Sequence, residues 1–252
     1  SGTTPKIDRA TLEDAVEDIV RTWADGFTTA LAQAHAPAEA RALFDRYAGA
    51  FSAGYRDAYA PAVAVHDIHL IEELTDERPL GVEFYPRDDE GEHRTVGLKV
   101  WSKARPLPLS ERVPVLENMG FRVVDERTFP VGERGDGDAD IWLHDMLLER
   151  RDGGAVELEG HKKRLETAFV VTMRGIAEND GYNALVLLGG LMWRDVALLR
   201  AVSRFLRQAR VPYSQDYMWT TLTRHAGIAA DVVALFHARF DPVGHDGRDQ
   251  RE

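Results

Sequence analysis

The sequence predicts an α+β protein in which a region of strands and helices lies between two helical segments. Near both ends of the chain, apolar residues recur every three or four positions, which is typical of amphipathic helices. In the middle, short runs rich in Val, Leu, Ile and aromatic residues are separated by turn residues, which indicates strands. The chain has 252 residues and is 44% apolar, so it can bury a sizeable core.

Residues 1–60 are expected to form an N-terminal helical segment. Thr11 followed by Asp14 is a capping-box signal for the start of a helix. One apolar stripe follows at helical spacing, formed by Leu12, Val16, Ile19, Val20, Trp23, Phe27 and Leu31. It predicts a long helix that ends near Pro37. A second stripe, formed by Leu43, Phe44, Tyr47, Phe51 and Tyr55, predicts an antiparallel partner helix.

Residues 61–152 change to a mixed pattern. Pro61 can open a short helix, and strands are predicted at 80–85 and 95–101. The stretch LPLSERVPVLENMGFRVVDE, residues 107–126, predicts a helix followed at once by a strand. Ser110 is the expected N-cap and Gly120 the expected stop, while Pro114 is acceptable only within the first helical turn.

The order of these elements predicts the architecture of the central region. Strand character continues over 121–129 and returns at 141–148, giving helix, strand, strand, helix, strand, strand. This order predicts a four-stranded antiparallel sheet with two helices. It is the ferredoxin-like arrangement, entered at an unusual point.

Residues 153–252 are expected to be helical again. A helix is predicted over 157–179, with an inner side formed by Leu158, Leu165, Phe169, Met173 and Ile176. Breaks at Asp180-Gly181 and Gly189-Gly190 separate it from helices predicted near 194–210, 214–224 and 227–240. The residues from Asp241 onward are polar and are expected to be frayed.

Composition excludes several classes of function. The absence of cysteine excludes disulfides, thiolate nucleophiles and cysteine-ligated metals, and agrees with a cytoplasmic location. No apolar run approaches the roughly 20 residues that span a bilayer, so no membrane partner is expected. The net charge of -11 repels phosphate backbones, so no nucleic-acid partner is expected either.

Two acidic clusters invite a metal-site hypothesis, and both lack the required spacing. His66, Asp67 and His69, with Glu72 and Glu73 one turn later, lack the H-E-x-x-H pattern of a zinc protease. Asp136, Asp138 and Asp140 resemble the start of a calcium loop, but Ile141 and Leu147 stand where glycine and glutamate are needed. Surface histidines and a solvated loop are the simpler interpretations. Arg134-Gly135-Asp136 is interpreted as a chance match to an integrin-recognition tripeptide.

No catalytic or cofactor-binding motif is present in the sequence. It contains neither a G-x-G-x-x-G after a strand nor a G-x-x-x-x-G-K, and no serine stands in a G-x-S-x-G elbow. We therefore expect no catalytic, cofactor-binding or metal-binding residue in this chain.

The remaining candidate site is a polar cluster with a row of arginines. The cluster ENDGYN contains Glu178, Asn179, Asp180 and Asn183, and structural capping explains it as well as a hinge or an interdomain contact does. Arg200, Arg204, Arg207 and Arg210 form a row on one predicted helix. This row is interpreted either as a solvated face or as a surface that docks against an acidic neighbouring domain.

Several segments resemble the large bacterial NAD-specific glutamate dehydrogenases. The most specific are residues 107–126 and the cluster ENDGYN with its apolar continuation ALVLLGGLMWR. Supporting segments are HDIHLIEEL at 66–74, TVGLKVW at 95–101, ADIWLHDMLLE at 139–149 and LFHARFDP at 235–242. Together they cover most of residues 40–242.

The resemblance implies a fragment with an ACT-like regulatory module, which is a ferredoxin-like fold, ahead of a catalytic domain that lies downstream. The implied parent enzyme converts glutamate, NAD and water to 2-oxoglutarate, ammonia and NADH. This fragment is then expected to be noncatalytic and to need no cofactor of its own. It would contact other domains of the parent enzyme and contribute to a homo-oligomer. The alternative is an ACT module that binds an amino-acid effector.

Overall fold

The computed structural model describes residues 22–87, 94–132 and 140–240. The chain divides into two compact units, and each is described by itself. The first comprises Ser1–Gly81, Trp101–Pro106 and Thr128–Leu143; the second comprises Val82–Val100, Leu107–Arg127 and His144–Glu252. The division crosses the strands, so each unit contains part of the sheet.

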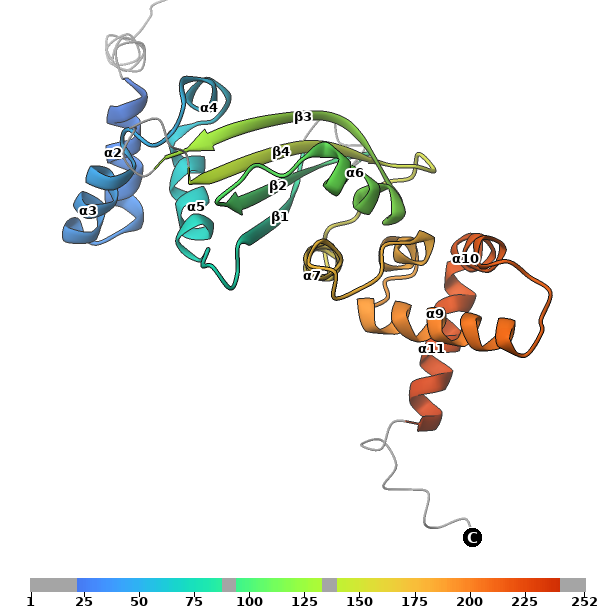
Figure 1. Cartoon of the computed structure of the whole chain (residues 1–252). Helices are drawn as coiled ribbons and strands as arrows, with labels where there is room; N and C mark the ends of the chain where they lie inside the picture. Colours follow the sequence, from blue (N-terminus) through green and yellow to red (C-terminus); the bar gives the residue numbers. More distant parts are fainter. Residues whose placement is uncertain (1–21, 88–93, 133–139, 241–252) are drawn as a thin grey trace, which may run out of the picture. The chain divides into compact units, whose positions relative to one another are not determined.

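A four-stranded antiparallel sheet confirms the predicted fold class (Figure 1). Its strands are β1 (Leu80–Pro86), β2 (Thr95–Lys103), β3 (Phe121–Val131) and β4 (Ile141–Arg150). They lie in the order β1-β2-β4-β3, and helix α6 (Leu109–Asn118) connects β2 to β3. The hairpins β1-β2 and β3-β4 are joined by α6, and β2 and β4 lie in the centre of the sheet. This is the ferredoxin-like arrangement, with the chain entering it at a helix instead of a strand.

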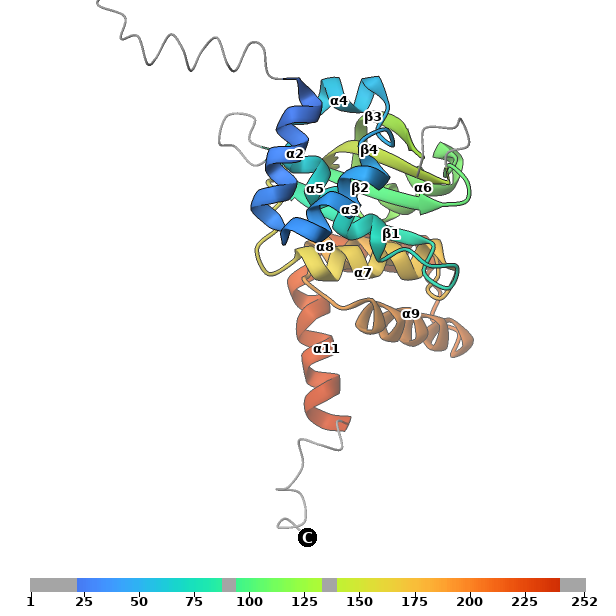
Figure 2. The same ribbon diagram turned by 90° about the vertical axis from the view of Figure 1, so that its left-hand side faces the viewer.

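In the first unit, the helices of residues 22–79 precede the sheet (Figure 2). They are α2 (Trp23–Ala34), α3 (Pro37–Tyr47), α4 (Ala53–Ala58) and α5 (Pro61–Glu72). Phe27, Tyr55 and Ile68 from these helices share one core with Trp101 and Leu143 from the strands. Burying such large side chains contributes about 1.5–3 kcal/mol each. As predicted, Pro61 occupies the first turn of α5, where its missing N–H costs nothing.

Two helix predictions in this unit were wrong. Thr22 has an extended backbone and forms a capping box with Asp25, so a helix starts at Trp23 and the predicted single helix does not run through Thr22. The Thr11–Asp14 signal lies outside the described residues. The predicted partner helix is two helices, because α3 ends at Tyr47 and Phe51 forms a bridge with Val131 before α4 begins.

In the second unit, a helical region follows the sheet. It comprises α7 (Lys162–Met173), the 3-10 turn η1 (Gly181–Asn183), α8 (Ala184–Leu188), α9 (Trp193–Gln208), α10 (Gln215–Arg224) and α11 (Ala226–Phe240). The helix predicted over 157–179 was too long at both ends. Gly160 and Gly175 have φ values of +72° and +68°, a left-handed geometry that interrupts a helix on either side of α7.

Helix α6 differs from the prediction at its start and agrees at its end. It begins after Pro108, so Ser110 is not the N-cap, and Pro114 lies in the helix interior rather than in the first turn. Gly120 has φ +92° and ends the helix, and β3 begins at Phe121, as predicted. The side of α6 that faces the core carries Arg112, Val115 and Leu116.

The two edges of the sheet differ. In the second unit, helix α7 closes the β1 edge: the backbone N–H of Phe84 donates to Glu166 Oε1 at 3.0 Å, and Lys162 Nζ lies 2.8 Å from Glu83 Oε1. Burial raises the pKa of Glu166. The β3 edge carries the exposed residues Arg122 and Arg127 instead. Charges of this kind discourage indiscriminate strand pairing.

Candidate functional site

The polar cluster 178–183 lies in the connection between α7 and α8, because α7 ends five residues before it. The side chain of Asp180 accepts a hydrogen bond from the backbone N–H of Tyr182 at 3.2 Å. Asp180 thereby caps η1. One role of the cluster is therefore to stop and restart the helical path.

Arg200 of α9 is buried and joins this connection to the helix. Its Nε and Nη2 donate to the two carboxylate oxygens of Asp180 at 2.7 and 2.8 Å. Nη2 also donates to Asn183 Oδ1 at 3.0 Å. This bidentate geometry is the strong form of an arginine–carboxylate pair. The interpretation of Arg200 as part of a solvated helix face was therefore wrong.

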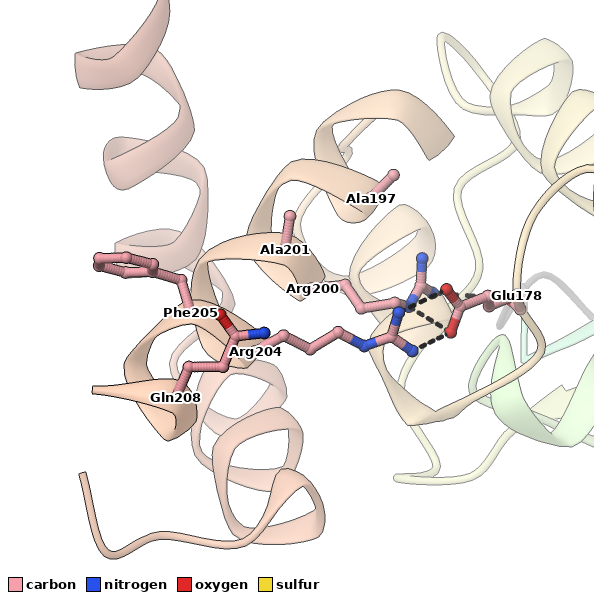
Figure 3. Close-up of a pocket in the computed structure, with 7 residues that line it drawn as sticks. All are labelled: Glu178, Ala197, Arg200, Ala201, Arg204, Phe205 and Gln208. Carbon is pink, nitrogen blue, oxygen red and sulfur yellow. Dashed lines mark hydrogen bonds and ion pairs between the residues drawn. The ribbon is translucent and has the colours of Figure 1, made fainter. Parts of the chain in front are cut away.

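The other arginines of the row differ from Arg200 and from one another. Figure 3 shows Arg200 and Arg204 extending together from α9 toward Glu178. Arg204 is exposed and donates to both carboxylate oxygens of Glu178, which raises its pKa. Arg207 is exposed on the last turn of α9. Arg210 lies beyond the helix with φ +69°, so the predicted row of four was wrong at its last member.

The two asparagines extend the cluster to its surroundings. Asn118 Nδ2, at the end of α6, donates to Asn179 Oδ1 at 2.9 Å. Asn183 is buried and donates from Nδ2 to the carbonyl oxygen of Glu178 at 2.9 Å. Each of the four predicted polar residues of the cluster thus has a partner within the second unit. The arrangement fixes the connection in place and shows no group poised for chemistry.

A second buried ionic network was missed by the sequence reasoning. Arg112 of α6 is buried, pairs with Glu126 of β3, and donates from Nη1 to the carbonyl oxygen of Leu107 at 2.6 Å. The backbone N–H of Leu107 donates to Nε2 of buried His144 at 3.0 Å, and His144 Nδ1 lies 3.5 Å from Glu126 Oε1. Both backbone polar groups of Leu107 are therefore held by side chains.

Burial sets the charge state of this network. Desolvation, together with the positive charge of Arg112, lowers the pKa of His144 to about 4, so the imidazole is neutral near pH 7. Burial also lowers the pKa of Arg112, against the opposing effect of Glu126. A signal was present in the sequence: Arg112, Val115, Leu116 and Met119 recur at helical spacing on one side of α6.

Comparison with known proteins identifies the segments that contain these networks. Family models described as glutamate dehydrogenase helical motif 2, ACT3 domain and helical motif 3 match residues 30–74, 79–161 and 177–242. The chain belongs to the glutamate dehydrogenase family. The Arg112 network lies in the ACT3 match, and the Arg200 network lies in the helical motif 3 match.

Curated relatives agree with this assignment. The chain is 37% identical over 236 residues to the NAD-specific glutamate dehydrogenase of Halomonas elongata, and 37% identical over 234 residues to that of Pseudomonas aeruginosa. It is 34% identical over 249 residues to the enzyme of the same name from Mycobacterium tuberculosis. These matches cover 94%, 93% and 97% of this chain. They cover only 14%, 14% and 15% of the relatives, so the chain corresponds to a small part of a large enzyme.

Several surface hollows lie in the second unit of this glutamate dehydrogenase segment. One of about 330 Å³ lies along α9 and is lined by Glu178, Ala197, Arg200, Ala201, Arg204, Phe205 and Gln208 (Figure 3). Another, of about 520 Å³, is lined by Arg204, Arg207, Gln208 and Gln215. Another, of about 290 Å³, is lined by residues of α6, η1, α8 and α10 with Gly120, Arg151 and Asp152, and combines acidic residues, an arginine and Trp219.

The residues weighed as a metal site have structural contacts instead. Asp67 is buried and accepts a hydrogen bond from the Tyr55 hydroxyl at 2.6 Å. The ring of His69 lies 5.0 Å from that of His35. Within the described ranges, no group of three or more His, Asp or Glu side chains is arranged to hold a metal ion. Asp136, Asp138 and the Arg134–Asp136 tripeptide lie outside the described residues.

Among the helices of residues 22–240 that the structure describes, none is long and apolar enough to cross a membrane.

Proposed function

We propose that this chain is a noncatalytic regulatory and scaffolding segment of an NAD-dependent glutamate dehydrogenase. The observation that carries the proposal is the succession of helical motif 2, ACT3 domain and helical motif 3, in this order, at residues 30–74, 79–161 and 177–242. The parent reaction would convert glutamate, NAD and water to 2-oxoglutarate, ammonia and NADH. NAD would bind to parts of the parent enzyme outside these 252 residues.

The proposed role defines the expected partners and domain organisation. Residues 1–60 form a helical segment, 61–152 the ACT-like domain, and 153–252 a helical segment that leads toward the catalytic domain. The partners are other domains of the parent enzyme and further copies of it in a cytoplasmic homo-oligomer. Arg207 is the member of the candidate site best suited to an interdomain contact, because it is exposed while Arg200 and Arg204 pair within the second unit.

The role is tested in the full-length parent enzyme by reversing the charge of Arg207. Arg207→Glu should weaken assembly or alter regulation and leave the fold intact, because the side chain is exposed. Oligomeric state is measured by analytical ultracentrifugation, and kinetics by glutamate-dependent NAD reduction. In the same assay, the isolated 252-residue chain should show no turnover.

Arg194→Glu is the matched control, since Arg194 is an exposed arginine near the other end of α9. Turnover by the isolated chain would refute the noncatalytic role. A parent enzyme that lacks residues 22–240 but keeps the wild-type assembly and kinetics would refute the scaffolding and regulatory role.

An amino-acid effector site is a second candidate function, favoured by the 290 Å³ hollow. Its lining includes the carboxyl groups of Glu117 and Asp152, which suit an α-amino group, and Arg151, which suits an α-carboxylate. Trp219 offers an apolar surface for a side chain. The alternative is therefore an ACT-type module that senses an amino acid.

Calorimetry decides this second candidate. The 252-residue chain is titrated with glutamate, aspartate, arginine and other amino acids, and one of them should release heat that Arg151→Ala abolishes. Arg122→Ala is the control, because Arg122 is an exposed arginine outside the hollow. Flat titrations across the panel would eliminate the effector function and would leave the scaffolding role in place.

A further inference from the structure

Helix α11 is apolar on nearly all sides. Only Asp231, His237 and Arg239 of its 15 residues have polar side chains, and the rest are aliphatic or aromatic residues and one glycine. A helix with this composition is normally buried inside a protein, because water cannot favourably solvate any of its faces. The composition therefore predicts that α11 is surrounded by other protein.

The second unit does not supply that surrounding. Of the α11 side chains, only Ala229 and Val233 are buried. The large apolar side chains on the helix are exposed, and their spacing places them along one broad side that also carries Arg239: Ile228 (60%), Val232 (44%), Leu235 (68%), Phe236 (37%) and Phe240 (60%). In both views the last turns of α11 extend past α9, although His237 still contacts Asp195 of α9 (Figures 1 and 2).

The exposed apolar side chains are concentrated in the C-terminal part of the chain that contains α11. Of the 14 exposed large apolar side chains in the described parts of the chain, ten lie in residues 202–240. Besides the α11 stripe they include Val202, Phe205 and Leu206 of α9, which follow helical spacing, and the stacked pair Tyr213 and Tyr217. Scattered single residues would need no explanation, but a concentration of this kind marks an interaction surface.

We propose that the exposed stripe of α11 docks into an apolar groove on another segment of the same glutamate dehydrogenase polypeptide, outside these 252 residues. The inference rests on the proposed function, since it requires a parent enzyme. The curated relatives are about seven times longer than the match, because the match covers 14% of their length. A groove on the same polypeptide also benefits from the high effective concentration that covalent linkage provides.

Charge argues against the other occupants. Two copies of this chain would each bring a net charge of -11, which opposes their association through this surface. The same charge opposes an anionic lipid surface, and α11 lacks the basic polar face of a membrane-surface helix. Arg207 and Arg210 lie exposed at the end of α9, so acidic residues are expected beside the groove.

The helix is already held in a defined position for docking. His237 Nε2 lies 2.8 Å from Asp195 Oδ1 near the start of α9, and Ala229 and Val233 anchor the other end of α11 in the core. The partner groove therefore meets a preformed helix rather than a segment that must fold on binding. Preorganisation of this kind lowers the entropic cost of association.

Hydrogen–deuterium exchange tests the proposal directly. Backbone amides of residues 232–240 are compared in the full-length parent enzyme and in the 252-residue chain. We expect exchange at least about tenfold slower in the parent, because docking removes the local opening that exposed helix ends undergo. Leu235→Glu in the parent should restore the fast exchange, and it should leave exchange in the 252-residue chain unchanged.

Ile176→Glu is the matched control, since Ile176 is similarly exposed (56%) but lies outside the stripe. Equal exchange rates in the parent and in the 252-residue chain would overturn the proposal. Protection of the 252-residue chain that rises with its concentration would also overturn the proposal, because it would indicate docking to a second copy. Protection that appears on adding anionic vesicles would overturn it as well. The exchange measurement does not depend on regulation. If exchange is slow in the parent enzyme while Arg207→Glu leaves its kinetics unchanged, the docking is supported and the regulatory role is refuted.

Discussion

In the part of the chain that the structure describes, two arginines are buried, and their charges are compensated to different extents. Arg112 of the ACT3 segment and Arg200 of helical motif 3 both project from a helix and pair with a carboxylate. Arg200 meets Asp180 in bidentate fashion and also donates to Asn183. Arg112 pairs with Glu126 and one carbonyl group, while its buried Nε has no hydrogen-bond partner among the described residues.

The difference shows what a buried charge needs in order to stabilise a fold. Removing a guanidinium from water costs several kcal/mol, which only good geometry and further hydrogen bonds offset. Arg200 receives that compensation, whereas the pKa of Arg112 is lowered by burial. Arg200 therefore fastens the connection 178–183 to α9, and Arg112 holds Leu107 at a higher energetic cost.

Substituting each arginine by methionine tests this contrast and should give the largest effect. Arg200→Met should lower the free energy of unfolding by about 3–5 kcal/mol, because Asp180 loses its partner. Arg112→Met should cost less, about 1–3 kcal/mol, because the unsatisfied Nε donor is removed together with the charge. Urea denaturation of the 252-residue chain, followed by circular dichroism, measures both.

Arg204→Met is the control for loss of an arginine from the same helix. Arg204 is exposed and its pair with Glu178 is open to solvent, so the change should be far smaller than that of Arg200→Met. Equal losses for Arg112→Met and Arg200→Met would contradict the view that hydrogen-bond compensation distinguishes the two sites.

Much of the fold was predictable because strand and helix periodicities are local. All four strands were predicted, each within three residues of its observed limits, and the order of elements gave the ferredoxin-like sheet. Helix ends were harder, since they depended on tertiary contacts. Phe51, between α3 and α4, pairs with Val131, and the apolar spacing around Phe51 gives no sign of that long-range bridge.

The candidate site was predictable as a location and less so in its arrangement. ENDGYN is a conspicuous polar cluster, and Asp180 does cap a turn. From the sequence, Arg200, Arg204 and Arg207 were predicted to be equivalent members of a row. In the structure Arg200 is buried and the other two are exposed. Burial of a charge depends on which carboxylate the fold brings near it, and 20 residues separate Arg200 from Asp180.

The buried His144 beside Arg112 also makes the free energy of unfolding depend on pH. The Arg200 site contains no histidine and should not contribute in this way. The pKa of His144 is lowered from 6.5 to about 4, chiefly by burial and then by the charge of Arg112. Between pH 6.5 and about pH 4, His144 is protonated in the unfolded chain and neutral in the folded chain. Stability contributed by neutral His144 is therefore complete above about pH 6.5 and falls as the pH drops toward 4.

The smallest predicted effect is this slope, and substitution of His144 by glutamine isolates it. From pH 6.5 to 4, His144 should remove at most about 1.4 kcal/mol of unfolding free energy per pH unit, on top of the background from other groups. His144→Gln should flatten the slope by that amount, since the amide oxygen can still accept from the Leu107 N–H and does not titrate. Urea midpoints across this pH range measure the slope.

His225→Gln is the control: it lies at an exposed position and should keep the wild-type slope. An unaltered slope in His144→Gln would show that His144 is protonated in the folded chain.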